Sequence, residues 1–129
     1  MSDAFSHVRH GLGSVRPYLH GPVNLPEFVR EVFGCVELER HAFGPDKFHV
    51  ELQLADSVLV IEAGELPAET KAWKGAVYVY VENVDVVYAK AVKLGAASVA
   101  PPADKPYQER QCGFLDAGGN MWWVSTYRG

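Results

Sequence analysis

Cysteine and long apolar runs are both scarce in this chain. Its two cysteines, Cys35 and Cys112, lie far apart and form no CxxC spacing, which favours free thiols in a reducing compartment over a disulfide framework. No apolar run approaches the roughly 20 residues that a membrane span requires. The N-terminal MSDAFSHVRHGLG lacks the apolar stretch of a signal peptide. We therefore predict a cytoplasmic protein with no membrane partner.

Positive charge is also in short supply. The 12 Lys and Arg residues are outnumbered by 16 Asp and Glu residues, for a net charge of −4, so nothing favours a nucleic-acid partner. A chain of 129 residues is long enough for one domain with a proper core. We predict a single domain over 14–129, preceded by a polar, flexible tail over 1–13.

What the sequence does contain is one pattern used twice, about 60 residues apart. Gly34 and Gly95 each follow a segment with helical periodicity, and Asp56 and Asp116 each close a strand before a turn. Repetition at a fixed period indicates a duplicated architecture. The alternation and turn signals predict a first module over 14–64, a linker over 65–74 and a second module over 75–127. The expected helices are 24–33 and 84–94, and the expected strands are 14–20, 35–42, 47–55, 57–63, 76–82, 97–101, 109–115 and 121–127.

Strict alternation assigns the strand faces. In KFHVELQLAD, His49 and Glu51 share the face opposite to the aliphatic residues, and in AVYVYVE, Tyr78 and Tyr80 do the same. The aliphatic faces fit burial under the two helices. A curved sheet would turn the polar and aromatic faces inward around a cavity, whereas a flat sheet would leave them in solvent.

Two adjacent tryptophans follow the glycine turn in FLDAGGNMWWVST. Neighbours on a strand point to opposite faces, so Trp122 is expected in the core and Trp123 on the other face. Trp123 therefore either walls a cavity or packs in an interface.

Several motifs together resemble the vicinal oxygen chelate superfamily of glyoxalases, extradiol dioxygenases and bleomycin-resistance proteins. They are most similar to the subgroup of bleomycin-resistance and phosphonate-operon proteins. The resemblance implies an α+β fold in which two tandem βαβββ modules form a curved mixed sheet around a cleft, with the helices outside, and it implies a homodimer. Ala117 stands where the family usually has proline. The motifs are PYL (17–19), EVFG (31–34), HVEL (49–52), YVYVENVDVVYAKAVKLGA (78–96), DKPYQER (104–110) and FLDAGGNMWW (114–123).

The resemblance also implies four metal-ligand positions in the metal-dependent members. In this chain they fall on Arg16, Ala76, Trp123, and either Val60 or, with a two-residue slip, Glu62. A guanidinium, a methyl group and an indole ring cannot ligate a metal, and one carboxylate does not hold an ion alone. We therefore predict neither a metal nor another cofactor.

These observations predict a metal-independent small-molecule-binding protein whose cleft holds a planar or aromatic ligand. His49 and Glu51 could serve as an acid–base pair or bind polar ligand groups, or they could form a solvated pair. Arg110 could hold an anionic ligand group or pair with Asp116. No catalytic residue is assigned. The predicted ligand-binding residues are Arg16, Tyr18, His49, Glu51, Glu62, Tyr78, Tyr80, Arg110 and Trp123.

Two alternatives follow from the same residues. One is a metal-dependent lyase, isomerase or dioxygenase with a shifted ligand set of His20, His49, Glu51 and Glu62. The other is an interaction module whose aromatic face only dimerises.

Overall fold

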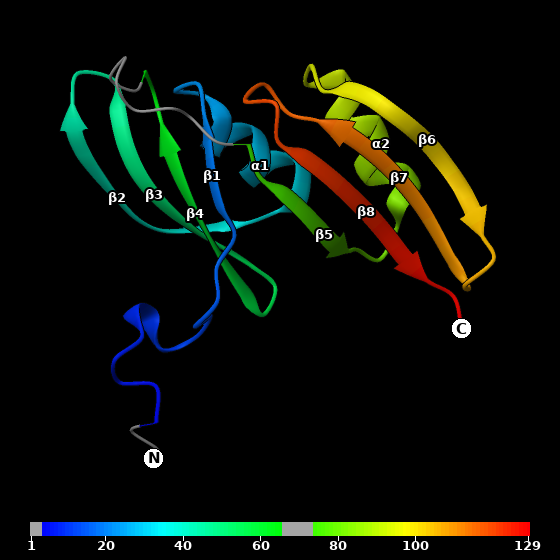
Figure 1. Cartoon of the computed structure of the whole chain (residues 1–129), viewed down its shortest axis with the longest axis horizontal. Helices are drawn as coiled ribbons and strands as arrows, with labels where there is room; N and C mark the ends of the chain where they lie inside the picture. The colour runs from blue at the N-terminus through cyan, green and yellow to red at the C-terminus, as the bar shows by residue number, and fades with distance from the viewer. Residues whose placement is uncertain (1–3, 66–73) are drawn as a thin grey trace.

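A computed structural model describes residues 4–65 and 74–129. Figure 1 shows two sheets side by side, with β1 and β5 at the inner edges and β2 and β6 at the outer edges. The first sheet contains β1 (Tyr18–Gly21), β2 (Val36–Gly44), β3 (Lys47–Leu54) and β4 (Ser57–Ala63), and its helix is α1 (Leu25–Phe33). The second sheet contains β5 (Ala76–Tyr80), β6 (Ala97–Lys105), β7 (Glu109–Leu115) and β8 (Met121–Tyr127), and its helix is α2 (Val84–Lys93).

The two sheets have the same topology. Their strand orders are β1-β4-β3-β2 and β5-β8-β7-β6. In each sheet the first strand pairs in parallel with the last strand of its module, and the other pairs are antiparallel. The predicted α+β fold of two βαβββ modules is confirmed.

The helices end where the sequence indicates. Gly34 closes α1 in the left-handed conformation at φ 69°, which glycine adopts without steric cost. Asn24 precedes α1 as expected, but its side chain makes no capping hydrogen bond. Asn83 does cap α2, because its side chain accepts a hydrogen bond from the backbone N–H of Val86.

Helix α1 joins the two modules into one core. Phe33 of α1 stacks on Trp122 of the second sheet with ring centroids 4.8 Å apart, and Phe28 meets Phe114 edge-on at 6.3 Å. Trp122 is completely buried, so the predicted division of the tryptophan pair holds for its first member. Such aromatic pairs stabilise the protein beyond the area that they bury. Because these pairs join residues of the two modules, neither module has a complete core of its own.

The turn before β8 fastens the modules together. Asp116 accepts hydrogen bonds from the backbone N–H of Gly118 at 2.8 Å and from the indole N–H of Trp122 at 2.8 Å. Asn120 donates to the carbonyl of His20 at 2.9 Å and accepts from the N–H of Gly75 at 2.8 Å. The turn therefore holds the end of β1 and the start of β5 to β8.

Two strands differ from the sequence expectation. β1 begins at Tyr18 rather than at residue 14, and residues 14–17 form no strand. β6 continues past Pro101 and Pro102 to Lys105. It is an edge strand with register shifts at this point, and edge positions and bulges tolerate proline.

The predicted tail over 1–13 and linker over 65–74 lie partly outside the described residues. Where residues 4–13 are described, Arg9–Gly11 form a short 3-10 turn. In the described residues, no helix has the length and apolar character needed to cross a membrane.

Candidate ligand-binding faces

Each sheet has one face that the helices do not cover, and we call these the first and second open faces. On the first sheet the strand register aligns His20, Glu62, His49 and His41 in one row across all four strands. A second row contains Tyr18, Val60, Glu51 and Glu39. The first open face consists of these two rows, together with Arg16 just before β1.

His49 lies between two carboxylates of the first open face. Its Nδ1 is 2.7 Å from Glu62 Oε1, and its Nε2 is 3.0 Å from Glu51 Oε2. The hydroxyl of Tyr18 also donates to Glu62 Oε1, at 3.1 Å. Burial disfavours the charged imidazole, but the hydrogen bonds with Glu62 and Glu51 outweigh it and raise the pKa of His49.

The N-terminal segment supplies the remaining partners of this face. Arg16 donates from Nη1 to Glu51 Oε1 at 3.0 Å, and Arg9 donates from Nη2 to Glu39 Oε2 at 2.6 Å. His10 Nε2 lies 2.7 Å from Glu39 Oε1 and 3.3 Å from Glu51 Oε1. These contacts join residues 29 or more positions apart, so local sequence pattern does not reveal them.

The second open face is mainly aromatic. Its rows, read across β5, β8, β7 and β6, are Tyr78–Trp123–Gly113–Ala100 and Tyr80–Ser125–Gln111–Ala103. Trp123 is half-buried on the side of β8 opposite to Trp122, as the alternation predicts. A Cβ on Gly113 would come within 2.6 Å of the Trp123 ring, so the indole lies directly against the backbone of β7.

A hydrogen-bonded cluster adjoins this aromatic row. The hydroxyls of Tyr78 and Tyr80 both donate to the carboxylate of Glu109, the second at 2.6 Å. Gln111 Nε2 donates to the Tyr78 hydroxyl at 2.9 Å and to the Ser125 hydroxyl at 3.0 Å. The two tyrosine side chains are therefore fixed at their hydroxyl ends, and about half of each side chain remains exposed.

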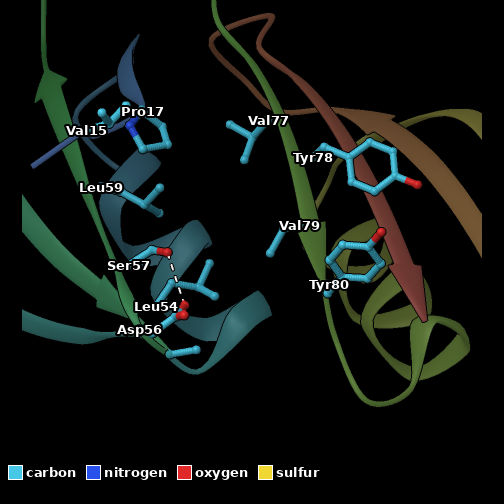
Figure 2. A pocket seen from close by; sticks show the side chains of 11 residues that line it. Val15, Pro17, Leu54, Asp56, Ser57, Leu59, Val77, Tyr78, Val79 and Tyr80 are labelled. Carbon is cyan, nitrogen blue, oxygen red and sulfur yellow. Dashed lines mark hydrogen bonds between the residues drawn. The ribbon is translucent and has the colours of Figure 1, made fainter. Parts of the chain in front are cut away.

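A groove of about 250 Å³ separates the modules behind β5. Figure 2 shows Val77 and Val79 pointing into it, towards Pro17 and Leu59 of the first module. The rings of Tyr78 and Tyr80 point the other way, over the second sheet. This groove is thus a mainly apolar seam between the modules, and it borders the second open face at Tyr78 and Tyr80.

Comparison with solved structures finds the same arrangement of helices and strands in other proteins. TioX from Micromonospora sp. ML1 matches with a TM-score of 0.69 and 21% identity, over 88% of this chain and 99% of that chain. A glyoxalase/bleomycin resistance protein/dioxygenase family enzyme from Burkholderia phytofirmans PsJN matches with a TM-score of 0.65 and 20% identity, over 87% and 94% of the two chains. The chain has the vicinal oxygen chelate fold.

A third structure of this fold is the fosfomycin resistance protein FosX from Mesorhizobium loti. It matches with a TM-score of 0.62 and 19% identity, over 88% of this chain and 91% of that chain. Scans against protein-family models and curated proteins found no match. At these identities the vicinal oxygen chelate fold carries no function by itself, so function must be argued from the residues of the site.

The metal positions expected in the vicinal oxygen chelate fold do not fit a metal here. Arg16 is bonded to Glu51 and to backbone carbonyls. Ala76 on β5 and Trp123 on the neighbouring strand β8 offer no donor. Glu62 alone has a suitable oxygen, and it is already engaged by His49 and Tyr18.

The shifted ligand set does not converge on one point either. Both ring nitrogens of His49 are directed at carboxylates, so Glu51 and Glu62 lie on opposite sides of its ring. Among the described residues, the three side chains His10, Glu39 and Glu51 do bring ligand atoms within 4.8 Å of one another. Arg9 and Arg16 bind the same two carboxylates and already supply the positive charge that an ion would bring.

Arg110 lies away from both open faces. Its guanidinium binds Asp85 of α2 through two hydrogen bonds, at 2.8 Å and 3.0 Å, and Asp104 through one at 3.2 Å. These pairs fix its side chain beside the helix, and the ion pair with Asp116 considered from sequence does not form. The eight other predicted site residues lie on the open faces, five on the first and three on the second.

Sequence reasoning missed Glu109 and Gln111, which anchor the second open face. The signal was available, since Glu109, Gln111 and Gly113 alternate along β7 with Arg110 and Cys112 on the other side. On the first open face it also missed Glu39 and the N-terminal Arg9 and His10. No local pattern points to those contacts.

Proposed function

We propose that this protein binds a planar organic molecule without a metal, on the second open face. The observation that carries the proposal is the row of Trp123, Tyr78 and Tyr80, which presents aromatic surface outward beside polar groups. Tyr78 and Tyr80 are 50% and 58% exposed, although large aromatic side chains are ordinarily buried in a monomer. Flat aromatic walls with a few fixed polar groups suit flat ligands.

We further propose that the protein is a homodimer in which each open face is completed by the partner. Both open faces expose aromatic side chains in the single chain, including Tyr18. A second copy laid against them would close a cleft of the kind that the fold accommodates. Analytical ultracentrifugation should then give twice the mass of one chain, and a monomeric mass at micromolar concentration would contradict this part of the proposal.

Binding of acridine tests the proposed function. Acridine is planar and, at mildly alkaline pH, uncharged. We expect equilibrium dialysis to show saturable binding that Trp123→Ala weakens by about tenfold or more, the size of effect typical of a buried aromatic contact.

The matched control is Phe43→Ala, which removes an exposed aromatic ring from edge strand β2 and should leave binding unchanged. Absence of acridine binding, or equal binding by the Trp123→Ala variant, would overturn the proposal. The alternative in which the aromatic face only dimerises predicts the first result, no acridine binding, together with loss of the dimer in Trp123→Ala.

A further inference from the structure

Glu109 is a carboxylate without a matching cation. The residue is only 9% exposed, and among the described residues no lysine, arginine or histidine lies within 4.0 Å of its oxygens. Acidic side chains are seldom so buried unless they are paired. Its partners are instead neutral: the hydroxyls of Tyr78 and Tyr80.

The surroundings keep this carboxylate charged. The hydrogen bonds from Tyr78 and Tyr80 lower the pKa of Glu109, because they stabilise the ionised form. The same contact with Glu109 raises the pKa of Tyr80 to about 12. At neutral pH the cluster therefore holds a single negative charge at the hydroxyl ends of two neutral phenol rings.

The two rings are inclined to each other and meet this charge at their hydroxyl ends. The centroids of Tyr78 and Tyr80 are 5.6 Å apart and the ring planes are inclined at 59°. A cation between them would lie within the roughly 6 Å of both ring centroids at which cation–π attraction operates. Because both hydroxyls are held by Glu109, the rings are fixed before any ligand arrives.

Two basic residues in the described part of the chain lie near Glu109 without forming an ion pair with it. Lys105 lies opposite Glu109 in the strand register, and with Arg128 it lines a cavity of about 240 Å³ beside Glu109. Arg128 is directed at Asp104, at 3.5 Å, and Lys105 makes no ion pair within 4.0 Å among the described residues. The cavity leaves room at this end of the face.

We propose that the ligand of the second open face is an organic cation, whose ammonium or quaternised ring nitrogen contacts the rings of Tyr78 and Tyr80 beside Glu109. Its planar part would extend towards Trp123, which adjoins Tyr78 in the strand register. This inference rests on the proposed function and adds to it the charge of the ligand. Neutral planar molecules would contact the aromatic rings of the second open face but leave the negative charge of Glu109 without a cation.

A pair of probes with nearly the same shape tests the charge. Acridine is neutral at mildly alkaline pH, and 10-methylacridinium carries a permanent positive charge on the same ring system. We expect 10-methylacridinium to bind at least about tenfold more tightly than acridine in equilibrium dialysis at fixed ionic strength. In Glu109→Gln that preference should fall to about twofold or less, while acridine binding is retained. Glu31→Gln, which removes the same charge from the exposed surface of α1, should keep the full preference.

Two changes at Tyr80 separate its ring from its hydroxyl. Tyr80→Phe keeps the π face and should retain most of the preference for 10-methylacridinium, whereas Tyr80→Leu should lose a large part of it. Equal binding of the two probes by the unaltered protein would overturn the inference and leave the proposed function standing. Binding of neither probe would overturn both. A preference that Glu109→Gln does not reduce would also overturn the inference.

Discussion

On the first open face every carboxylate meets a guanidinium or an imidazole, whereas on the second open face the partners of Glu109 among the described residues are the neutral hydroxyls of Tyr78, Tyr80 and Ser125. Glu51 is bonded to Arg16 and His49, so its charge is matched within the chain. The two faces are built on the same strand order and descend from the same sequence pattern. The difference teaches that one scaffold can carry a closed ionic lattice on one sheet and an unmatched charge on its copy.

This contrast affects which of the two open faces would give a ligand the more favourable binding free energy. Binding at the first open face would have to displace intramolecular ion pairs that are already formed. Binding at the second open face would add a partner to a charge that has none. The predictions below test this contrast from its largest expected effect to its smallest.

Glu51→Gln should lower the free energy of unfolding by about 2 kcal/mol, because removing one partner of a buried ion pair leaves the other uncompensated. The stranded groups would be Arg16 and His49, and the Glu51 side chain is only 5% exposed. Urea denaturation followed by circular dichroism measures the change. Glu109→Gln is the counterpart on the other face and should leave the urea midpoint nearly unchanged, because it strands no cation. Equal losses from both substitutions would remove the contrast.

Gly113→Ala should displace the Trp123 ring and cost about 1 to 2 kcal/mol, as overpacking commonly does. The new Cβ would lie 2.6 Å from Trp123 Cζ3 and 2.7 Å from Met121 Cε. Tryptophan fluorescence and thermal melting measure the two effects. Gly44→Ala in the first module is the control, because its Cβ would meet only the flexible side chain of Lys47, at 3.2 Å. An unshifted emission spectrum in Gly113→Ala would show that the indole does not depend on the missing side chain.

Zinc or manganese should shift the melting temperature by less than about 1 °C, because a metal stabilises only in proportion to its affinity for the folded state. On the first open face, Arg9 and Arg16 already occupy the carboxylates near His10. Differential scanning fluorimetry of protein purified without chelator measures the shift. Arg9→Ala releases Glu39 and is the variant in which a metal-dependent shift should first appear. A shift of several degrees in the unaltered protein would identify the first open face as a metal site.

His20 should make the folded protein slightly less stable as the pH falls. Burial lowers the pKa of His20 more than the nearby Glu62 raises it, so the unfolded chain takes up this proton first. The stability contributed by neutral His20 is fully present above its unfolded pKa of about 6.5 and is lost as the pH falls below it. Unfolding free energies of the unaltered protein and His20→Gln, compared across this range, measure the contribution. Parallel curves would contradict it.

Much of the fold follows from local pattern. The strands at 57–63, 109–115 and 121–127 coincide with β4, β7 and β8, because alternation and glycine turns bound them on both sides. The sequence pattern ends β6 four residues too early, since Pro101 and Pro102 interrupt a strand unless it lies at an edge. Whether a strand is an edge is decided by the whole sheet.

The sequence predicts which face of a strand a site residue lies on, but it does not predict which residue far along the chain it contacts. Alternation placed Trp123, Tyr78 and Tyr80 on one face, but it could not show that both tyrosine hydroxyls reach Glu109 about 30 residues away. The same limit applies to Arg110, whose partner Asp85 lies on a helix 25 positions earlier. Residue types identify what can interact, and only the tertiary structure selects the partner.

The stacking of Phe33 on Trp122 bears on how this duplicated chain could be divided. If the two halves were produced as separate polypeptides, each would present an unfilled hydrophobic surface that the other is shaped to cover. Fragments of this kind are expected to be poorly soluble alone and to reconstitute when they are synthesised together. The chain therefore offers a natural split site for a complementation reporter, in which reassembly would restore the aromatic face of the second half.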